Sequence, residues 1–481
     1  MWQKIISKIS HSLSDNHLKR HKIYYSCVVD ASSLFYWQTW GLVNSLIQIA
    51  KVSPTQIFVH YTLEVDQTFL QQLNILGVNL KSISRFGDGK YCNKIVQLDT
   101  REFAKAKCVF FLDTDMVVLD ELEELYIPKV IRGKVVDLAN PELSVLQAIF
   151  KRAGFSDTPS ICNADCEKNS TFENNFNGGL YVVPGVLIPS LGKRWQHWAL
   201  WLLANLEILE KVNKQNHVDQ ISFALATHEL SLVTQNIDRQ YNYPIHLSNY
   251  KTGNPKVLHY HRNISPTGML VVGGEQDVEF KRAVQNANHV LGKSFNNQIF
   301  WSFRYHEFPQ LGSGIGSRGE NLLYKRKLLK TLGIETSQSI LDVGCGDLEV
   351  IKNFNLPNYI GVDISSEAVN IAKQKRPDLD FILLDYSNNN HISKADLVIC
   401  LEVLIHQQNL PDYQKVINFL AQKTINRLVV SGYVVKETHH DNNYMINFHE
   451  SLLDSLAKTK QFSRIEVLGQ HSDVQIILAT K

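Results

Sequence analysis

The stretch Ile340-Leu341-Asp342-Val343-Gly344-Cys345-Gly346-Asp347 decides the fold of the C-terminal part of the chain. It predicts a hydrophobic strand over 339–343 that ends in a Gly-x-Gly turn, where the backbone can approach a ligand closely. The stretch Tyr359-Ile360-Gly361-Val362-Asp363 predicts a second strand, which ends in an acid placed to accept hydrogen bonds from a ribose diol. Together the two strands and the glycine turn between them predict a cofactor crevice at the carboxyl ends of parallel strands.

This stretch resembles the class I methyltransferases that use S-adenosylmethionine, and the resemblance extends from about Gly312 to the C-terminus. It implies contacts with the methionine, ribose and adenine parts of the cofactor, in that order, by Asp342, Gly344 and Gly346, by Asp363, and by Asp385. Leu348 stands where such a turn usually has a third glycine. A dinucleotide-binding fold is the alternative for the same pattern, but it needs that glycine to seat the pyrophosphate on the helix N-terminus.

The run Asp396–His406 looks like the fourth-strand motif that lies beside the substrate in the same family. If the methyl acceptor is a sugar hydroxyl, a base within hydrogen-bond reach assists the transfer, and Glu402 and His406 are the candidate catalytic residues. The alternative for His406 is a structural role, packing against or capping the helix after the strand.

The N-terminal part of the chain alternates short apolar runs with helical stretches. Strands are predicted over 23–30, 56–61, 80–84 and 108–112, with helices over 36–50, 65–76 and 93–105 between them. A Gly- and Ser-rich stretch then interrupts the alternation. The predicted fold class is therefore α/β, with two Rossmann-like domains in tandem. The predicted boundaries are an N-terminal amphipathic segment over 1–22, a first domain over 23–290, a linker over 291–318 and a second domain over 319–481.

Two acids follow the apolar strand of the first domain directly, in Val109-Phe110-Phe111-Leu112-Asp113-Thr114-Asp115. Charges at such a position are costly to bury unless they bind something. Two carboxylates at a strand end suit Mg²⁺ or Mn²⁺, which can bridge the phosphates of a nucleotide-sugar. The alternative is a strand that simply leaves the sheet into a solvated turn.

Four further motifs follow in a fixed order: Asn93-Lys94, the glycine-rich Phe176–Val183, His217–Gln220 and Lys256–His261. With the acid pair they resemble the glycosyltransferases of the glycogenin and lipopolysaccharide galactosyltransferase type, over roughly 23–264. The resemblance implies a metal site, a diphosphate contact, sugar contacts, a pair near the anomeric carbon, and a contact to the base or ribose. These are, in that order, Asp113, Asp115 and His259; Lys94; Asn177, Gly178 and Gly179; the catalytic candidates Asp219 and Gln220; and Asp30.

The last of these motifs departs from the family. The sequence His259-Tyr260-His261-Arg262 is not followed by the family's Gly and Lys-Pro-Trp, so His261 could replace His259 as the metal ligand. A structural role is the alternative for whichever histidine is left over.

Charge and cysteine content narrow the partners and the compartment. Lys plus Arg is 49 against 47 for Asp plus Glu, so the net charge of +2 excludes an electrostatic footprint for nucleic acid. Seven scattered cysteines indicate reduced thiols, and Cys162 and Cys166 lack the second pair that a zinc site needs. Without a recognisable signal peptide, we expect a cytoplasmic protein. The helically spaced apolar residues of segment 1–22 predict either contact with the inner face of the membrane or packing on their own domain.

These features predict a bifunctional transferase that builds a surface polysaccharide or glycolipid. The first domain would transfer a sugar from a nucleotide-sugar donor to a glycan or glycolipid acceptor, and the second would methylate a sugar hydroxyl with S-adenosylmethionine. One alternative is a methyltransferase whose first domain only binds a carbohydrate or nucleotide. A scaffold of two degenerate domains is disfavoured, because both acid pairs, Asp113 with Asp115 and Asp342 with Asp363, are intact.

Overall fold

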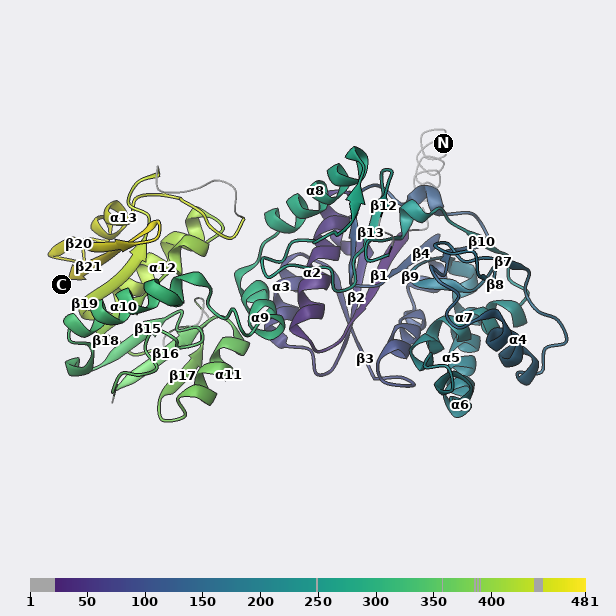
Figure 1. The fold of residues 1–481 in the computed structure, drawn as a ribbon, viewed down its shortest axis with the longest axis horizontal. Helices are drawn as coiled ribbons and strands as arrows, with labels where there is room; N and C mark the ends of the chain where they lie inside the picture. The colour runs from purple at the N-terminus through teal and green to yellow at the C-terminus, as the bar shows by residue number, and fades with distance from the viewer. Residues whose placement is uncertain are drawn as a thin grey trace, which may run out of the picture. The chain divides into compact units, whose positions relative to one another are not determined.

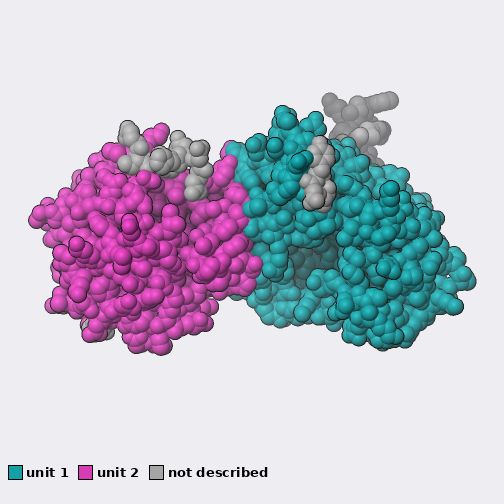
Figure 2. All heavy atoms as spheres, in the orientation of Figure 1, with its two compact units in different colours: residues 1–264, 270–290 teal, residues 265–269, 291–481 magenta. Residues whose placement is uncertain are grey.

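A computed structural model describes residues 22–247, 250–356, 358–384, 386, 389, 391–436 and 444–481. The chain divides into two compact units, residues 1–264 with 270–290 and residues 265–269 with 291–481 (Figure 2). Each unit contains a seven-stranded sheet with helices, which confirms the predicted α/β fold class with two Rossmann-like parts. The amphipathic segment predicted over 1–22 lies outside the described residues except for its last residue, and Asp385 lies outside them too.

The large sheet of unit 1 has the strand order β10-β6-β9-β4-β1-β2-β3. Strand β9 runs antiparallel to β4 and β6, and the other pairs are parallel. Its strands are β1 (Ile23–Val29), β2 (Ile57–Thr62), β3 (Asn79–Ile83), β4 (Cys108–Leu112), β6 (Ile131–Val135), β9 (Phe176–Pro184) and β10 (Thr234–Asn236). A smaller sheet of β11 (Tyr243–Pro244), β13 (Val257–His259) and β5 (Met116–Val118) follows the acid pair. Two short pairs complete the unit: β7 (Ile161–Asn163) with β8 (Ser170–Phe172), and β12 (Tyr250–Lys251) with β14 (Glu275–Gln276).

Helices cover both faces of this sheet, with α2 and α3 on one side of β1 and β2 and α5 and α7 on the other (Figure 1). The α-helices are α2 (Ser33–Gln48), α3 (Gln67–Ile75), α4 (Leu143–Arg152), α5 (Ile188–Ala204), α6 (Glu207–Glu210), α7 (Val218–Glu229) and α8 (Val278–Lys293). The helix predicted over 93–105 is instead two 3₁₀ stretches, η2 (Tyr91–Asp99) and η3 (Phe103–Lys105). Thr100 separates them because its backbone is extended.

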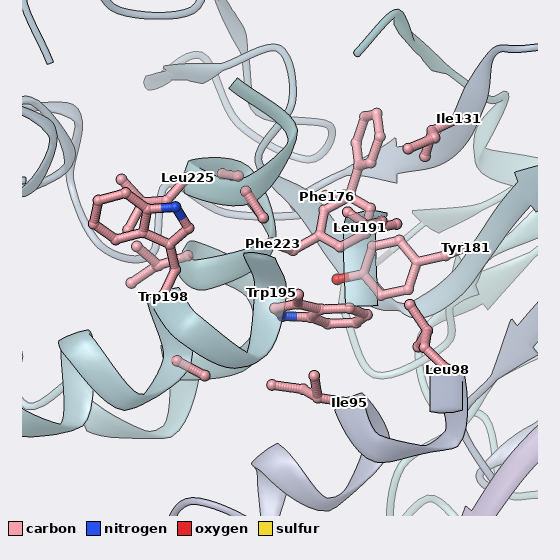
Figure 3. Close-up of a cluster of buried hydrophobic side chains, with 14 of the residues drawn as sticks. Ile95, Leu98, Ile131, Phe176, Tyr181, Leu191, Trp195, Trp198, Phe223 and Leu225 are labelled. Atoms are coloured by element: carbon pink, nitrogen blue, oxygen red, sulfur yellow. The ribbon is translucent and has the colours of Figure 1, made fainter. Parts of the chain in front are cut away.

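The core of unit 1 explains why β4 delivers two acids to one place. All five residues of β4 are buried, and alternate side chains point to opposite faces. The rings of Tyr181, Trp195 and Phe223 pack together on one face of the sheet (Figure 3), and Phe111 belongs to the same buried cluster. On the other face Phe110 stacks on Tyr25, with ring centroids 4.9 Å apart. Because side chains pack against both faces of β4, the turn that follows it, which carries Asp113 and Asp115, has little freedom to move.

The sheet of unit 2 has the order β17-β16-β15-β18-β19-β21-β20, in which β21 runs antiparallel to both its neighbours. Its strands are β15 (Ile340–Val343), β16 (Tyr359–Asp363), β17 (Asp380–Leu383), β18 (Ala395–Cys400), β19 (Thr424–Gly432), β20 (Arg464–His471) and β21 (Val474–Thr480). Strands β15 and β16 agree with the two strands predicted over 339–343 and 359–363. The carboxyl ends of β15, β16 and β18 meet at one edge because the three strands are parallel neighbours.

The helices of unit 2 are α9 (Asn297–Glu307), α10 (Gly319–Thr331), α11 (Ser366–Lys375), α12 (Leu410–Lys423) and α13 (Leu452–Lys458). The residue types of 349–353, between the first two predicted strands of this unit, predict a helix. That prediction is wrong: these residues form turns, and the N–H groups of Ile351 and Lys352 both donate to the Leu348 carbonyl. The predicted linker 291–318 contains α9, so its Gly and Ser residues mark turns rather than an extended tether. Within the described part of the chain, no helix is long and apolar enough to cross a membrane.

Candidate active sites

Unit 2 has a pocket at the carboxyl edge of its sheet, with about 960 Å³ of atom-free space that is partly open to solvent. Its walls include most of the residues predicted for the cofactor and for catalysis: Asp342, Gly344, Asp363, Glu402 and His406. Gly346 lies between two lining residues, Cys345 and Asp347. The structure therefore brings these predicted residues to one place.

The glycine turn is required by close packing. Gly344 and Gly346 have φ angles of +77° and +54°, which side chains rarely adopt. A Cβ atom on Gly344 would lie 2.2 Å from Val403 Cγ2, and one on Gly346 would lie 2.4 Å from Ser313 Oγ. Leu348 also has a left-handed backbone, with φ of +62°, and its side chain is buried in the core. The position where a third glycine was expected thus keeps the backbone shape that glycine favours.

Two buried carboxyl groups, Asp342 and Asp363, line the pocket. Burial raises the pKa of Asp342 to about 7, although its Oδ2 accepts a hydrogen bond from the Tyr359 hydroxyl at 2.8 Å. Burial raises the pKa of Asp363 to about 6, although it accepts the N–H groups of Ser365 at 2.9 Å and Gly346 at 3.0 Å. Each carboxylate oxygen can accept a second hydrogen bond. The pair suits a ligand that carries a positive charge and a diol.

The two candidate bases differ in their surroundings. Glu402 accepts a hydrogen bond from the buried Lys325 ammonium at 2.6 Å, and His471 Nε2 lies 3.2 Å from the same oxygen. His406 donates from Nδ1 to the Met445 carbonyl at 2.7 Å, which leaves the Nε2 lone pair in the neutral ring. Burial lowers the pKa of His406, so the neutral form dominates near pH 7.

Sequence reasoning missed one wall of this pocket. Asn297, Trp301 and Tyr305 of α9 all line it, and Asn297 donates to the His406 carbonyl at 2.7 Å. The Trp301 ring meets the His406 ring edge-on, with centroids 5.0 Å apart. The signal was present, because residues four apart share a helix face. It was overlooked because the stretch was assigned to a linker.

Unit 1 places its candidate site where β4 ends. The Asp113 carboxylate pairs with Lys94 Nζ at 2.6 Å, and the same ammonium lies 3.3 Å from Asp219 Oδ2. Burial opposes the charge on Lys94, but the carboxylates of Asp113 and Asp219 raise its pKa well above the usual range. Asp115 turns instead toward His259 and His261. The two acids of the motif therefore have different partners.

The residues around Asp115 fit a divalent metal ion. His259 donates from Nδ1 to Asn242 Oδ1 at 3.0 Å. Among the described residues, its buried Nε2 has no hydrogen-bond partner, although Asp115 Oδ1 lies 3.3 Å away. Burial lowers the pKa of His259 and raises that of Asp115, but the charges of these groups outweigh burial: Asp115 raises the pKa of His259, and His259 and His261 hold the pKa of Asp115 well below its usual range. A carboxylate beside two imidazoles, whose deprotonated nitrogens bind divalent metals, is a suitable donor set.

The glycine-rich entry to β9 makes room for both groups. A Cβ atom on Gly179 would lie 2.8 Å from His259 Cε1, and one on Gly178 would lie 3.1 Å from Lys94 Nζ. Asn177, predicted to face a sugar, uses its side chain internally: its Nδ2 donates to Asp137 at 2.6 Å, and its Oδ1 accepts the Gly179 N–H at 2.9 Å. The motif therefore leaves space for His259 and Lys94 and does not present the Asn177 side chain to a sugar.

The remaining predicted residues have mixed surroundings. Asp219 is buried, and among the described residues its Oδ1 has no hydrogen-bond partner, so burial raises its pKa despite the Lys94 charge. The amide of Gln220 lies beside the same glycine turn, since its Nε2 is 3.4 Å from the Cβ position of Gly178. Asp30 accepts two hydrogen bonds from Arg85, at 2.7 and 2.9 Å, a partner that sequence reasoning missed.

A second acidic group in unit 1 is neutralised by cations. Asp137 and Asp165 approach Cys166, but both acids also pair with the fully buried Lys134, and Arg239 binds Asp165 at 2.7 Å. Burial raises the pKa of the Cys166 thiol to about 12, so it is protonated. This group is a structural ion-pair network.

Comparisons with known proteins agree with two domains in this order. Residues 26–231 match a family model described as a Rhodobacterales glycosyltransferase domain, and residues 318–458 match one described as a methyltransferase domain. Protein 235L of Invertebrate iridescent virus 6, named as a methyltransferase, is 25% identical over 139 residues. That match covers 27% of this chain and 51% of the viral protein, so the chain spans about half the length of this curated relative.

Two solved structures are among those that this chain matches. Magnesium protoporphyrin IX methyltransferase from Synechocystis PCC 6803, with bound SAH, is 20% identical. The match covers 40% of this chain and 99% of that chain, with a TM-score of 0.31. Mouse xyloside xylosyltransferase 1 is 12% identical over 50% of this chain and 98% of that chain, with a TM-score of 0.33.

Proposed function

We propose that this chain, which joins a domain of a glycosyltransferase family to a domain of a methyltransferase family, is a bifunctional transferase of glycan assembly. Unit 1 transfers a sugar from a nucleotide-sugar, and unit 2 transfers a methyl group from S-adenosylmethionine to a sugar hydroxyl. The observation that carries the proposal is the pocket of unit 2, where two buried acids and a neutral histidine line the same space. We further propose that the protein works in the cytoplasm, where both donors are available.

In the methylation half-reaction, S-adenosylmethionine supplies an electrophilic methyl group on a sulfonium. Asp342 and Asp363 attract the cationic cofactor, and Asp363 binds its ribose. The turn at Gly344 and Gly346 leaves room for its methionine part. His406 Nε2 takes the proton of the acceptor hydroxyl as the new O–C bond forms and the C–S bond breaks. Because the His406 Nδ1–H is held by the Met445 carbonyl, the ring presents its lone pair in one fixed orientation.

In the sugar-transfer half-reaction, a divalent metal bound at Asp115 and His259 would supply positive charge to the departing diphosphate. The chain itself contributes Asp115 and His259 as metal ligands and the Lys94 ammonium as a second positive charge. Asp219 and Gln220 lie beside the same glycine turn, where they can contact the reacting sugar. The bond from the anomeric carbon to the diphosphate oxygen breaks, a new bond to the acceptor oxygen forms, and the hydroxyl proton is released with the diphosphate.

The test uses the purified chain with labelled S-adenosylmethionine, a panel of nucleotide-sugars with Mn²⁺ or Mg²⁺, and lipid-linked or free glycans. We expect metal-dependent consumption of one nucleotide-sugar and transfer of label to the glycan. His406→Gln should lose only the methyl transfer, and Asp219→Asn only the sugar transfer. Label that accumulates on protein alone would remove the glycan from the proposal.

A second candidate is a methyltransferase whose unit 1 only binds a carbohydrate or nucleotide. Two observations favour it. The Asp113 carboxylate forms an ion pair with Lys94, and both polar atoms of the Asn177 side chain form hydrogen bonds within unit 1. One result distinguishes the two candidates. If the parent chain consumes no nucleotide-sugar with any divalent metal but still binds a nucleotide-sugar, unit 1 is better described as a binding module.

A further inference from the structure

Three side chains of unit 1 converge, and the first acid of the Asp-x-Asp motif is not one of them. Asp115, His259 and His261 each offer a ligand atom, and these atoms all lie within 4.8 Å of one another. His259 Nε2 is 3.3 Å from Asp115 Oδ1, and His261 Nδ1 is 3.2 Å from Asp115 Oδ2. The two imidazole rings face each other with centroids 4.0 Å apart. One carboxylate and two imidazoles thus surround a single point.

The backbone holds these three residues together. Strand β13 pairs with β5 so that His259 lies opposite Met116, and the Tyr260 N–H donates to the Asp115 carbonyl at 3.0 Å. His261 then takes a left-handed backbone conformation, with φ of +49°, which is uncommon for a residue other than glycine. Gln38 of α2 holds its carbonyl with a hydrogen bond of 2.7 Å. The position of His261 is therefore fixed from two sides.

A relay of side chains fixes which nitrogen of His259 is free. His259 Nδ1 donates to Asn242, Asn242 donates to Asn177 at 3.1 Å, and Asn177 donates to Asp137. Asp137 in turn pairs with the buried Lys134. Every amide in this relay has only one orientation that satisfies its neighbours. The relay therefore holds a proton on Nδ1 and aims the Nε2 lone pair at the site, as outer partners of metal-bound histidines do.

Asp113 is engaged elsewhere. Its carboxylate pairs with Lys94 at 2.6 Å, and moving it to a metal would leave the Lys94 ammonium, whose side chain is only 17% exposed, with less compensation. Lys94 also lies near the Asp219 carboxylate and donates to the Gly178 carbonyl at 3.3 Å. Asp113 is thus part of a cationic contact rather than of the group around Asp115.

We propose that Asp115, His259 and His261 are the protein ligands of the metal, and that Asp113 positions Lys94 instead. This inference rests on the proposed function of unit 1 as a metal-dependent sugar transferase. Mg²⁺ favours oxygen ligands, whereas imidazole suits later divalent metals of the first transition row. Two nitrogens and one carboxylate therefore select Mn²⁺, Co²⁺ or Zn²⁺ over Mg²⁺.

The experiment titrates the full chain with Mn²⁺ and follows free Mn²⁺ by electron paramagnetic resonance, with Mg²⁺ as competitor. We expect His261→Ala to weaken Mn²⁺ binding at least tenfold and Asp113→Asn to change it less than threefold. His261→Asp should restore Mn²⁺ binding and shift the preference toward Mg²⁺, because it replaces a nitrogen by an oxygen ligand. His197→Ala, at an exposed position of α5, is the matched control. Thermal unfolding without metal checks that each variant is folded.

The outcomes separate this inference from the proposed function. If Asp113→Asn weakens Mn²⁺ binding more than His261→Ala does, or if His261→Ala binds like the parent, the ligand set is wrong. A parent chain that binds no divalent metal overturns it as well. If Mn²⁺ binds through His261 but no nucleotide-sugar is consumed, the ligand set stands and the proposed sugar transfer fails.

Discussion

The affinity for S-adenosylmethionine should depend on pH through the two buried acids of unit 2. The carboxyl groups of Asp342 and Asp363 must each lose a proton before they can attract the sulfonium. The binding of S-adenosylmethionine should therefore tighten as the pH rises through 6 to 7. With its pKa of about 7, Asp342 is roughly 75% ionised at pH 7.5 and about 3% ionised at pH 5.5, a change of about 25-fold. The ionised fraction of Asp363, with its pKa of about 6, changes by a factor of about four over the same pH range, and the two changes together set the expected change in Kd.

The assay measures the Kd of S-adenosylmethionine by calorimetry at pH 5.5 and 7.5. S-adenosylhomocysteine, which lacks the sulfonium charge, should show a smaller change. Asp342→Asn should remove most of the pH dependence and weaken binding at pH 7.5, whereas Asp380→Asn, at an exposed position of β17, should leave both unchanged. A parent Kd that is the same at both pH values, or a slope that survives in Asp342→Asn, would refute the reasoning.

Three further results are expected. His406→Gln should lower kcat for methyl transfer by about 10²- to 10⁴-fold while the Kd of S-adenosylhomocysteine stays unchanged, because only the base is lost; a parallel loss of cofactor affinity would contradict this. Trp301→Ala should raise KM for the glycan acceptor without lowering sugar transfer by unit 1, and an unchanged KM would exclude Trp301 from the acceptor site. Phe223→Ala should destabilise unit 1 by about 3–5 kcal/mol in chemical unfolding, because its ring is fully buried against Tyr181 and Trp195; a loss under about 1 kcal/mol would show that the core refills the space.

The fold was predictable from the sequence because its signals are local. Two strands that end at a site, β4 and β15, are short apolar runs followed at once by an acid or a glycine, after Leu112 and Val343. The errors have local causes too. The stretch after Leu348 has helical composition but folds into turns, and the Gly- and Ser-rich stretch after α9 hid the helix that precedes it.

The sites were less predictable because partners distant in sequence decide them. Composition could not show that Lys325 neutralises Glu402, or that Arg85 binds Asp30. The same holds for Asp113, whose partner Lys94 lies 19 residues earlier in the chain, in η2. His261 joins His259 beside Asp115 through a left-handed backbone conformation at His261, which the residue types do not indicate. These facts follow from packing, and a pattern of residue types does not contain them.

Leu348 ties the shape of the cofactor turn to the interior of unit 2. Its left-handed backbone costs about 1–2 kcal/mol relative to a right-handed one, whereas replacing a buried leucine by alanine costs about 2–5 kcal/mol. Burial of the Leu348 side chain therefore outweighs the cost of its backbone conformation, and this packing keeps the loop in its bent shape. Loosening the packing around Leu348, which also lines the pocket, should let the loop relax away from the shape that receives the ligand.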